Sequence, residues 1–401
     1  MSTNAGNDTL ARTLDATNGR IKSLDLLRGA AIIGVIIVHI LFGLGRGYDV
    51  VWKLNPTEFL YAGLPMFMII TGYLHKPGNT YSWNVKHRVV PLIMVLFVST
   101  IILTTIMYCY MYFLGYDLDQ YNLFKDICEI LIGKECFSVI GTDSFHSGLV
   151  LAPYDISAGF YYLQILAVGL LIFYAVVDGV IDDWKETSIT ILALLCVTAL
   201  YLATIGIQLP FSAQLGPVVA AFLLFGAMLR KHNVAEFIER GYGHVNYWVI
   251  LAVSLVVGCV FVYFFPSGMQ LYNSTFGAYG EWSVFTFFVL SVSCGIILWY
   301  IAALMVRIPL VSSFFILAGM NSIILFSQHM FLAKMMTAPF YDIGTEWWIT
   351  IDDLSIRVAV LIASIGLSFA LMNVVKKLSG TMDKNKTDDI SWMTQDDHLN
   401  P

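Results

Sequence analysis

The sequence predicts an all-α, polytopic integral membrane protein with about ten transmembrane helices. Hydrophobic residues make up 58% of its 401 residues and charged residues only 12%, whereas soluble proteins are roughly 45–50% apolar. The apolar residues stand in continuous runs, while a transmembrane β-barrel would show short alternating strands. Composition and run length therefore exclude a soluble protein and favour a bundle of membrane helices.

Ten apolar segments are candidate spans, because most are close to the roughly 17–25 residues that cross a bilayer. In chain order they are 24–45, 57–74, 90–114, 158–178, 188–206, 216–229, 247–265, 282–305, 310–336 and 354–373. We expect them to form one domain over residues 21–377. The polar tails at 1–20 and 378–401 are predicted to be disordered and cytoplasmic.

Positive charge is unevenly shared between the two sides that ten spans create. With both termini inside, 16 of the 22 lysines and arginines fall in cytoplasmic segments, as the positive-inside rule requires. The sequence thus predicts a multi-pass plasma-membrane protein with cytoplasmic termini. The long acidic loop 115–157 then faces outside. The net charge of −6 and the lack of a basic stripe give no support for a nucleic-acid partner.

The first span, LDLLRGAAIIGVIIVHI, carries Arg28 near one end and His39 inside it. Eleven residues of helix put both side chains on one face, about 16 Å apart along the axis. Ionisable groups inside a span are costly unless they face a polar interior. The pair therefore predicts a polar path through the bundle. Taken singly, Arg28 also fits the charge rule, and His39 also fits a packing role between helices.

The third span begins VKHRVVP, which places Lys86, His87 and Arg88 at the cytoplasmic mouth beside Arg28. Several cations there could bind a polyanion such as the phosphates of a nucleotide carrier. The alternative is again the ordinary excess of positive charge on the inner side.

The ninth span contains AGMNSIILFSQHMF, in which Ser322 and His329 lie seven residues, or two turns, apart on one face. His329 is expected at a depth similar to that of His39. Two histidines at one depth favour a shared wet cavity, although a packing histidine bonded across helices remains an equal alternative.

The segment 24–40 resembles the opening of acyltransferase family 3, membrane enzymes that use acyl-CoA to modify extracytoplasmic glycans. The matching residues are Asp25, Arg28, Gly29 and His39, with the family's Arg-x10-His spacing. Further matches follow in the family's order, at Gly72, Tyr73, Arg88, Pro91, Tyr162, Leu163, Gly319, Ser322 and His329, with Thr71 in place of the family's serine before Gly72. The chain departs from the pattern at Val85, where the family usually has a second arginine, and at Tyr161, where it usually has tryptophan.

The resemblance implies an acyltransferase that transfers groups other than amino-acyl groups. An acetyl or succinyl group would pass from cytosolic acyl-CoA to a hydroxyl of a cell-surface or exported polysaccharide or glycolipid. His39 would be the catalytic base, with His329 as a second catalytic candidate. Arg28, Lys86 and Arg88 would bind the carrier. Acyl-CoA is then a co-substrate, and no permanently bound cofactor or metal is expected.

On the acceptor side, we expect contributions from the outer loop and from the outer ends of the fourth and ninth spans. The candidates are His146, Asp155, Tyr161 and Ser322, although the loop residues among them could simply be solvated. The expected partners are therefore acyl-CoA, an extracytoplasmic glycan acceptor and the lipid bilayer.

Two rival functions stay open. Multi-span amine N-acetyltransferases of glucosamine-type sugars have a similar first span, and a glycan or lipid exporter would also bury charges along its path. Binding or hydrolysis of acyl-CoA separates both kinds of enzyme from the exporter. In the outer loop, Cys128 and Cys136 could form a disulfide, as an oxidising compartment allows, or remain free thiols.

Overall fold

The structure is a computed structural model. It describes residues 21–37, 40, 63–115, 123–124, 127, 131, 160–182, 186–204, 209–264, 283–337 and 354–382. All regular elements in these ranges are helices, which confirms the all-α prediction for this part of the chain. The tail 1–20, most of the loop 115–157, and both Cys128 and Cys136 lie outside the described residues.

Each predicted apolar segment contains a helix. In order they are α2 (Lys22–Ile37), α4 (Gly63–Tyr73), α5 (Tyr81–Asn84) with η2 (Val85–Val89) and α6 (Val90–Phe113), α9 (Phe160–Asp182), α10 (Glu186–Thr204), η6 (Pro210–Leu215) with α11 (Gly216–Lys231), α13 (Val245–Phe264), α15 (Ser283–Met305), α16 (Pro309–Met320) with α17 (Ser322–Thr337), and α18 (Leu354–Met382). The short α12 (Val234–Arg240) and η7 (Gly241–Gly243) join α11 to α13.

Four stretches of the described chain are long and apolar enough to cross a membrane. They are Tyr81–Phe113, Tyr162–Gly179, Ala213–Lys231 and Val284–Met305. The bent pair α16 and α17 makes a fifth if it is counted as one span. A membrane protein is therefore supported, while the number of ten spans stays a prediction.

The predicted ninth span is not one straight helix. It is divided at Asn321 into α16 and α17, which are bent by 76°. The Asn321 side chain donates from Nδ2 to the Leu317 carbonyl at 2.7 Å, and so satisfies one of the carbonyls that the end of a helix leaves without a partner. Ser322 consequently begins α17 rather than lying inside a continuous helix.

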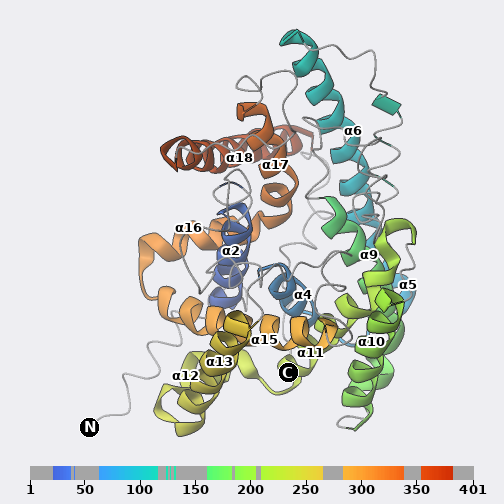
Figure 1. The fold of residues 1–401 in the computed structure, drawn as a ribbon, viewed down its shortest axis with the longest axis vertical. Coiled ribbons are helices and arrows are strands. Elements are labelled where there is room, and N and C mark those ends of the chain that lie inside the picture. The colour runs from blue at the N-terminus through green and yellow to red at the C-terminus, as the bar shows by residue number, and fades with distance from the viewer. Residues whose placement is uncertain are drawn as a thin grey trace.

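Helix α2 is central to the bundle, where it packs against α16, α4, α15 and α17 (Figure 1). Two glycines allow its close approach to α16. A Cβ on Gly29 would overlap the Phe315 carbonyl, and a Cβ on Gly319 would overlap the Asp25 carbonyl. Gly29 and Gly319 are both residues of the matching motifs, so these parts of the motifs serve helix packing.

Helices α4 and α11 cross in the same way. A Cβ on Gly72 would overlap the backbone of Leu223, and one on Gly226 would overlap the Ile69 carbonyl. The hydroxyl of Thr71 donates to the Phe67 carbonyl of its own helix at 2.6 Å. The Thr-Gly part of this motif thus fits α4 closely against α11.

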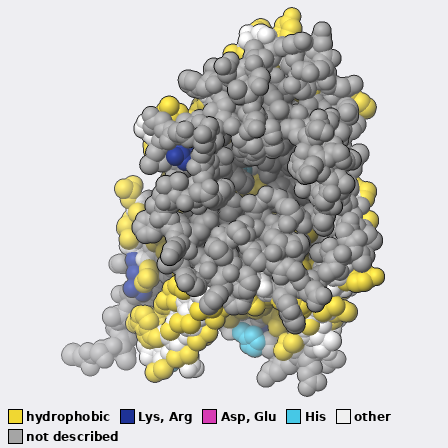
Figure 2. All heavy atoms as spheres, in the orientation of Figure 1, with side chains coloured by type: hydrophobic (Ala, Val, Ile, Leu, Met, Phe, Trp, Pro, Cys, Tyr) yellow, Lys and Arg dark blue, Asp and Glu magenta, His cyan; other side chains and the backbone are white. Residues whose placement is uncertain are grey.

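Large hydrophobic side chains are exposed along the outer faces of several helices. Examples are Met94 on α6, Val253 on α13 and Ile362 on α18, whose exposed fractions are 56%, 55% and 66%. Figure 2 shows hydrophobic side chains along the margins of one face, where described atoms are visible. Lipid tails would cover such a surface, which in water would be an interaction patch.

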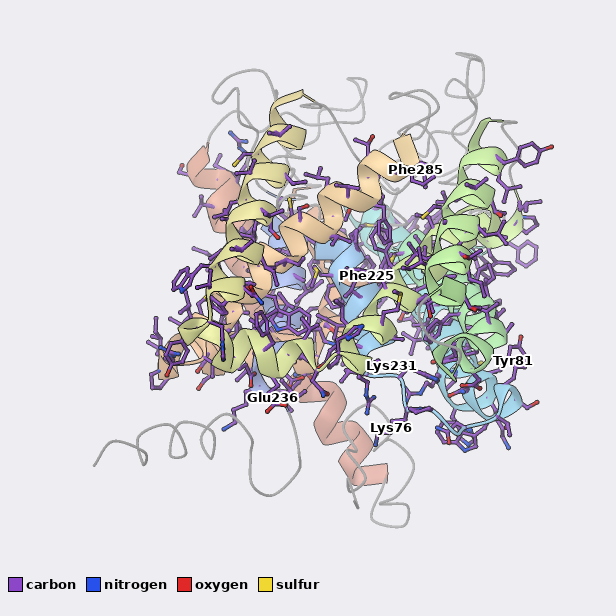
Figure 3. The ribbon with its side chains drawn as sticks, turned by 90° about the horizontal axis from the view of Figure 1, so that it is seen from below. Lys76, Tyr81, Phe225, Lys231, Glu236 and Phe285 are labelled. Atoms are coloured by element: carbon purple, nitrogen blue, oxygen red, sulfur yellow. The ribbon has the colours of Figure 1, made fainter. Side chains whose placement is uncertain are left out.

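One end of the bundle is polar. In Figure 3, Lys76, Lys231 and Glu236 lie along the same edge, whereas Phe285 lies towards the opposite one. The Ser23 hydroxyl donates to the Glu239 carboxylate at 2.5 Å, which joins the start of α2 to α12 at this end. Segments that the charge pattern assigns to the cytoplasm therefore meet at one end, which we call the polar end.

Candidate functional site

Tyr162 is a buried residue near the start of α9 and lies between two aromatic rings of other helices. Its ring centroid is 6.2 Å from that of Phe67 on α4 and 4.9 Å from that of Phe326 on α17. The side chain is 4% exposed. Its hydroxyl has no hydrogen-bond partner among the described residues. A buried hydroxyl normally has a partner, so this one calls for an explanation.

His329 follows Phe326 on α17 and is completely buried. Its ring lies 5.6 Å from the Phe326 ring, and its Nδ1 lies 2.7 Å from the Phe326 carbonyl oxygen. Because a carbonyl can only accept, Nδ1 must carry the hydrogen. In the neutral imidazole the lone pair is then on Nε2, which makes Nε2 the basic atom of this histidine.

Arg28 supplies the charge at this place. It is half-buried on α2 and close enough to the Tyr162 hydroxyl to interact with it electrostatically. Side chains from α2, α9 and α17 therefore meet inside an otherwise apolar bundle. We call Arg28, Tyr162, Phe326 and His329 the central site. Two of its members, Arg28 and His329, were predicted from the sequence.

A second group of polar side chains lies at the polar end, where α4, η2, α9 and α11 meet. Its centre is His75, which is 3% exposed and whose Nε2 lies 3.7 Å from Oδ1 of Asp178. The Arg88 guanidinium lies near the Tyr174 hydroxyl and interacts with it electrostatically. Arg230 completes the group, and we call these five residues the mouth cluster.

Arg230 holds the turn that carries His75. Its Nη1 donates to the carbonyl oxygen of Tyr73, the last residue of α4, at 3.4 Å, and to that of His75 at 2.5 Å. A cation is favourable at the C-terminal end of a helix, where carbonyl groups lack partners. The hydroxyl of Tyr73 also accepts a hydrogen bond from the Ala235 amide at 3.4 Å.

Arg88 and Lys86 have different surroundings although only one residue separates them. Both lie in η2, a turn of π-helix, shortly before Pro91. Proline has no amide hydrogen and its ring crowds the carbonyl four residues earlier, which accounts for the wider turn. Lys86 is exposed, whereas Arg88 is half-buried against α9. Of the predicted cations in this segment, Arg88 is therefore the one that faces the bundle.

The two arginines lie against different parts of α9. Arg28 interacts electrostatically with Tyr162, and Arg88 with Tyr174. These tyrosines are twelve residues apart, or about 18 Å along a helix axis. The two arginines therefore act on tyrosines at different levels of α9, whereas the sequence suggested that Arg28 and Arg88 lie side by side. Arg88 lies at the level of the polar end, and Arg28 lies at a level nearer the middle of the bundle.

The His75 imidazole is electrostatically unusual. Burial lowers its pKa from the ordinary value, the Asp178 carboxylate acts in the opposite direction, and the positive charge of Arg88 reinforces the effect of burial. The separation of 3.7 Å from Asp178 is longer than a well-formed hydrogen bond. His75 is therefore neutral at neutral pH.

The remaining predicted site residues are only partly described. Ser322 is 8% exposed at the start of α17. The side chain of Tyr161, and the whole of His39, His146 and Asp155, lie outside the described residues. The roles given to these four stay predictions.

Sequence reasoning missed Tyr162, His75, Asp178 and Arg230 as site residues. Tyr162 belongs to a matching motif, but only the structure shows that its hydroxyl is buried. The other three are ordinary polar residues near helix ends in the sequence. Only the folded structure brings these three residues together, because they come from segments about 50 to 150 residues apart in the sequence.

The family model described as an acyltransferase domain, that of acyltransferase family 3, matches residues 21–373. The match covers every helix of the central site and of the mouth cluster. No curated protein and no solved structure shows a significant match to the chain.

Proposed function

Because the chain belongs to acyltransferase family 3, we propose that it transfers an acetyl or succinyl group from cytosolic acyl-CoA to a hydroxyl of a cell-surface or exported polysaccharide or glycolipid. The observation that carries this proposal is the central site. A charge, a hydroxyl and an imidazole lie there inside an apolar bundle, and such groups in a membrane interior are functional candidates by default.

The mouth cluster supports the position of the carrier. Arg88 and Arg230 put two guanidinium groups at the polar end, and a guanidinium can bind phosphate through two parallel hydrogen bonds. The phosphates of CoA would bind there, on the cytoplasmic side. Its extended arm would reach past Arg28, about 18 Å further along α9 from the level of Arg88, and would bring the thioester to the central site.

The chemistry requires a base, an acceptor hydroxyl and a thioester. The family resemblance assigns the base to His39, and His329 is the second candidate. The base would take the proton of the acceptor hydroxyl as its oxygen forms a bond to the thioester carbonyl carbon. The carbon–sulfur bond would then break, and the CoA thiolate would leave and take up a proton. The acceptor would approach from the outer side, where His146, Asp155, Tyr161 and Ser322 are the proposed contacts.

Comparison of surface glycans from cells with and without the gene tests the function. Mass spectrometry should show a mass difference of one acetyl or succinyl group that disappears with the gene and returns with the wild-type copy. His39→Ala in an inserted and abundant protein should not restore it. Identical glycans in both strains, or full restoration by His39→Ala, would contradict the proposal.

Binding of acyl-CoA separates the enzyme from an exporter. The purified protein in detergent should bind acetyl-CoA or succinyl-CoA saturably and release free CoA when an acceptor is present. A protein that moves glycans without either property would instead support the exporter.

A further inference from the structure

We propose that the hydroxyl of Tyr162 is the hydrogen-bond donor to the thioester carbonyl oxygen of the acyl-CoA. The inference rests on the proposed function and adds a catalytic residue to it. It begins from the hydroxyl itself, which belongs to a side chain that is 4% exposed and has no hydrogen-bond partner among the described residues.

Other tyrosines of the bundle show how such hydroxyls are normally satisfied. Tyr300 donates to the Tyr247 carbonyl at 3.0 Å, and Tyr110 donates to the Met335 carbonyl at 2.9 Å. The hydroxyls of these two tyrosines thus have acceptors within the protein. Tyr162 is equally well packed, with ring contacts to two phenylalanines. Its hydroxyl, however, has no hydrogen-bond partner among the described residues. A buried donor without a partner is costly unless a ligand uses it.

The surroundings of Tyr162 fit an oxygen that becomes negative. Arg28 is within electrostatic range of the hydroxyl, so a positive charge acts on the same place. On the other side, Phe326 contacts Tyr162 with its ring and accepts the Nδ1 hydrogen of His329 with its carbonyl. Tyr162 on α9 thus lies within the electrostatic range of a cation on α2 and against the phenylalanine on α17 that holds the His329 imidazole.

The reaction needs this combination. When the acceptor oxygen bonds to the thioester carbon, the carbonyl π electrons move to the oxygen, which becomes an oxyanion. A preorganised donor in a water-poor site stabilises this charge more strongly than it stabilises the neutral carbonyl, and so it lowers the barrier. When the carbonyl is restored, the carbon–sulfur bond breaks and the thiolate leaves. Tyr162 keeps its proton throughout and donates only a hydrogen bond.

The test compares Tyr162→Phe with wild type and with Tyr300→Phe, a buried tyrosine whose hydroxyl already has a protein partner. The donor is acetyl-CoA or succinyl-CoA, and the acceptor is cell envelope from a strain that lacks the gene. Release of CoA thiol gives kcat and KM, and thermal unfolding in detergent gives Tm. We expect Tyr162→Phe to lower kcat about 100-fold or more, as loss of an oxyanion donor does, with KM for the acyl-CoA within about twofold and an unchanged or higher Tm.

The control should behave in the opposite way. Tyr300→Phe should lower Tm, because it removes the hydrogen bond from this hydroxyl to the Tyr247 carbonyl, and should keep the wild-type kcat. The inference would be overturned if Tyr162→Phe kept the wild-type kcat, or if its loss of kcat came with a fall in Tm. In both cases turnover by the wild-type protein would still support the proposed acyltransferase activity. Absence of turnover in the wild type with either acyl-CoA would overturn the proposed function, and the inference with it.

Discussion

Arg88 and Lys86 lie two positions apart in the same turn of π-helix, and their surroundings predict different effects on carrier binding. Arg88→Ala removes a half-buried guanidinium that lies near Tyr174. It should weaken acyl-CoA binding by about 1.5–3 kcal/mol, the worth of a hydrogen bond to a charged group. Arg88→Lys should restore only part of this, because an ammonium lacks the planar fork. Isothermal titration with acetyl-CoA measures the effect.

Lys86→Ala is the matched control, since its side chain is exposed. Its effect should remain within about 0.5 kcal/mol, as for most surface substitutions. Equal losses in Lys86→Ala and Arg88→Ala would mean that the carrier is attracted by general positive charge and not by a site.

His75 should make the stability of the protein depend on pH. Its pKa in the folded protein is lower than the ordinary value of 6.5, chiefly because of burial. As the pH falls below 6.5, the unfolded chain therefore binds this proton before the folded protein does. Stability should be highest above pH 6.5 and should decline as the pH falls towards the lower, folded pKa.

Thermal unfolding in detergent between about pH 7.5 and pH 5, a range that spans the ordinary histidine pKa, measures this decline. In His75→Gln the decline should be smaller than in wild type, because a glutamine side chain cannot take up a proton. His244→Gln changes an exposed histidine and should keep the wild-type response. An undiminished response in His75→Gln would show that other groups cause it.

The glycines at the crossing of α2 and α16 determine how closely these two helices pack. Gly29→Ala and Gly319→Ala each place a methyl group against a backbone carbonyl of the opposite helix, which no rotamer change can relieve. Each should cost more than the roughly 1–3 kcal/mol of ordinary overpacking. We expect a lower Tm and less folded protein in detergent, measured by thermal unfolding and size-exclusion chromatography.

Gly366→Ala provides the comparison, because the Cβ it would add to α18 meets nothing within 4 Å. It should leave Tm unchanged or slightly higher, since alanine restricts the unfolded chain more than glycine does. If Gly29→Ala and Gly319→Ala unfold at the wild-type temperature, α2 and α16 are not in close contact.

Helices could be predicted from the sequence because apolar run length reports directly on membrane helices. The departures from straight helices could not be predicted in the same way. Asn321 lies in a stretch whose flanks are apolar, so hydropathy continues across the bend between α16 and α17. Pro91 alone does not predict the π-helical turn η2, because proline near the start of a helix is usually tolerated.

For the molecule as a whole, one class of site residue could be predicted from the sequence and another could not. Arg28 and His329 are ionisable groups inside apolar runs, so the cost of burying them identifies them in the sequence. His75, Asp178 and Arg230 stand at helix ends, where polar residues are ordinary. Only the packing of α4, α9 and α11 gives them significance, by removing His75 from solvent and bringing the other two to it.

The orientation of the whole bundle leads to the last prediction. The polar end contains segments rich in positive charge, so we expect it to face the cytoplasm. Two probes are placed in a version without the six native cysteines. Glu236→Cys reports on the polar end (Figure 3). Phe124→Cys, whose side chain is 75% exposed, reports on the loop 115–157, which the sequence predicts to face outside. In intact cells, a membrane-impermeant maleimide should label Phe124→Cys. Glu236→Cys should react only after permeabilisation. The reverse pattern would put the mouth cluster outside, away from cytosolic acyl-CoA, and would leave Arg88 and Arg230 without the carrier they are proposed to bind.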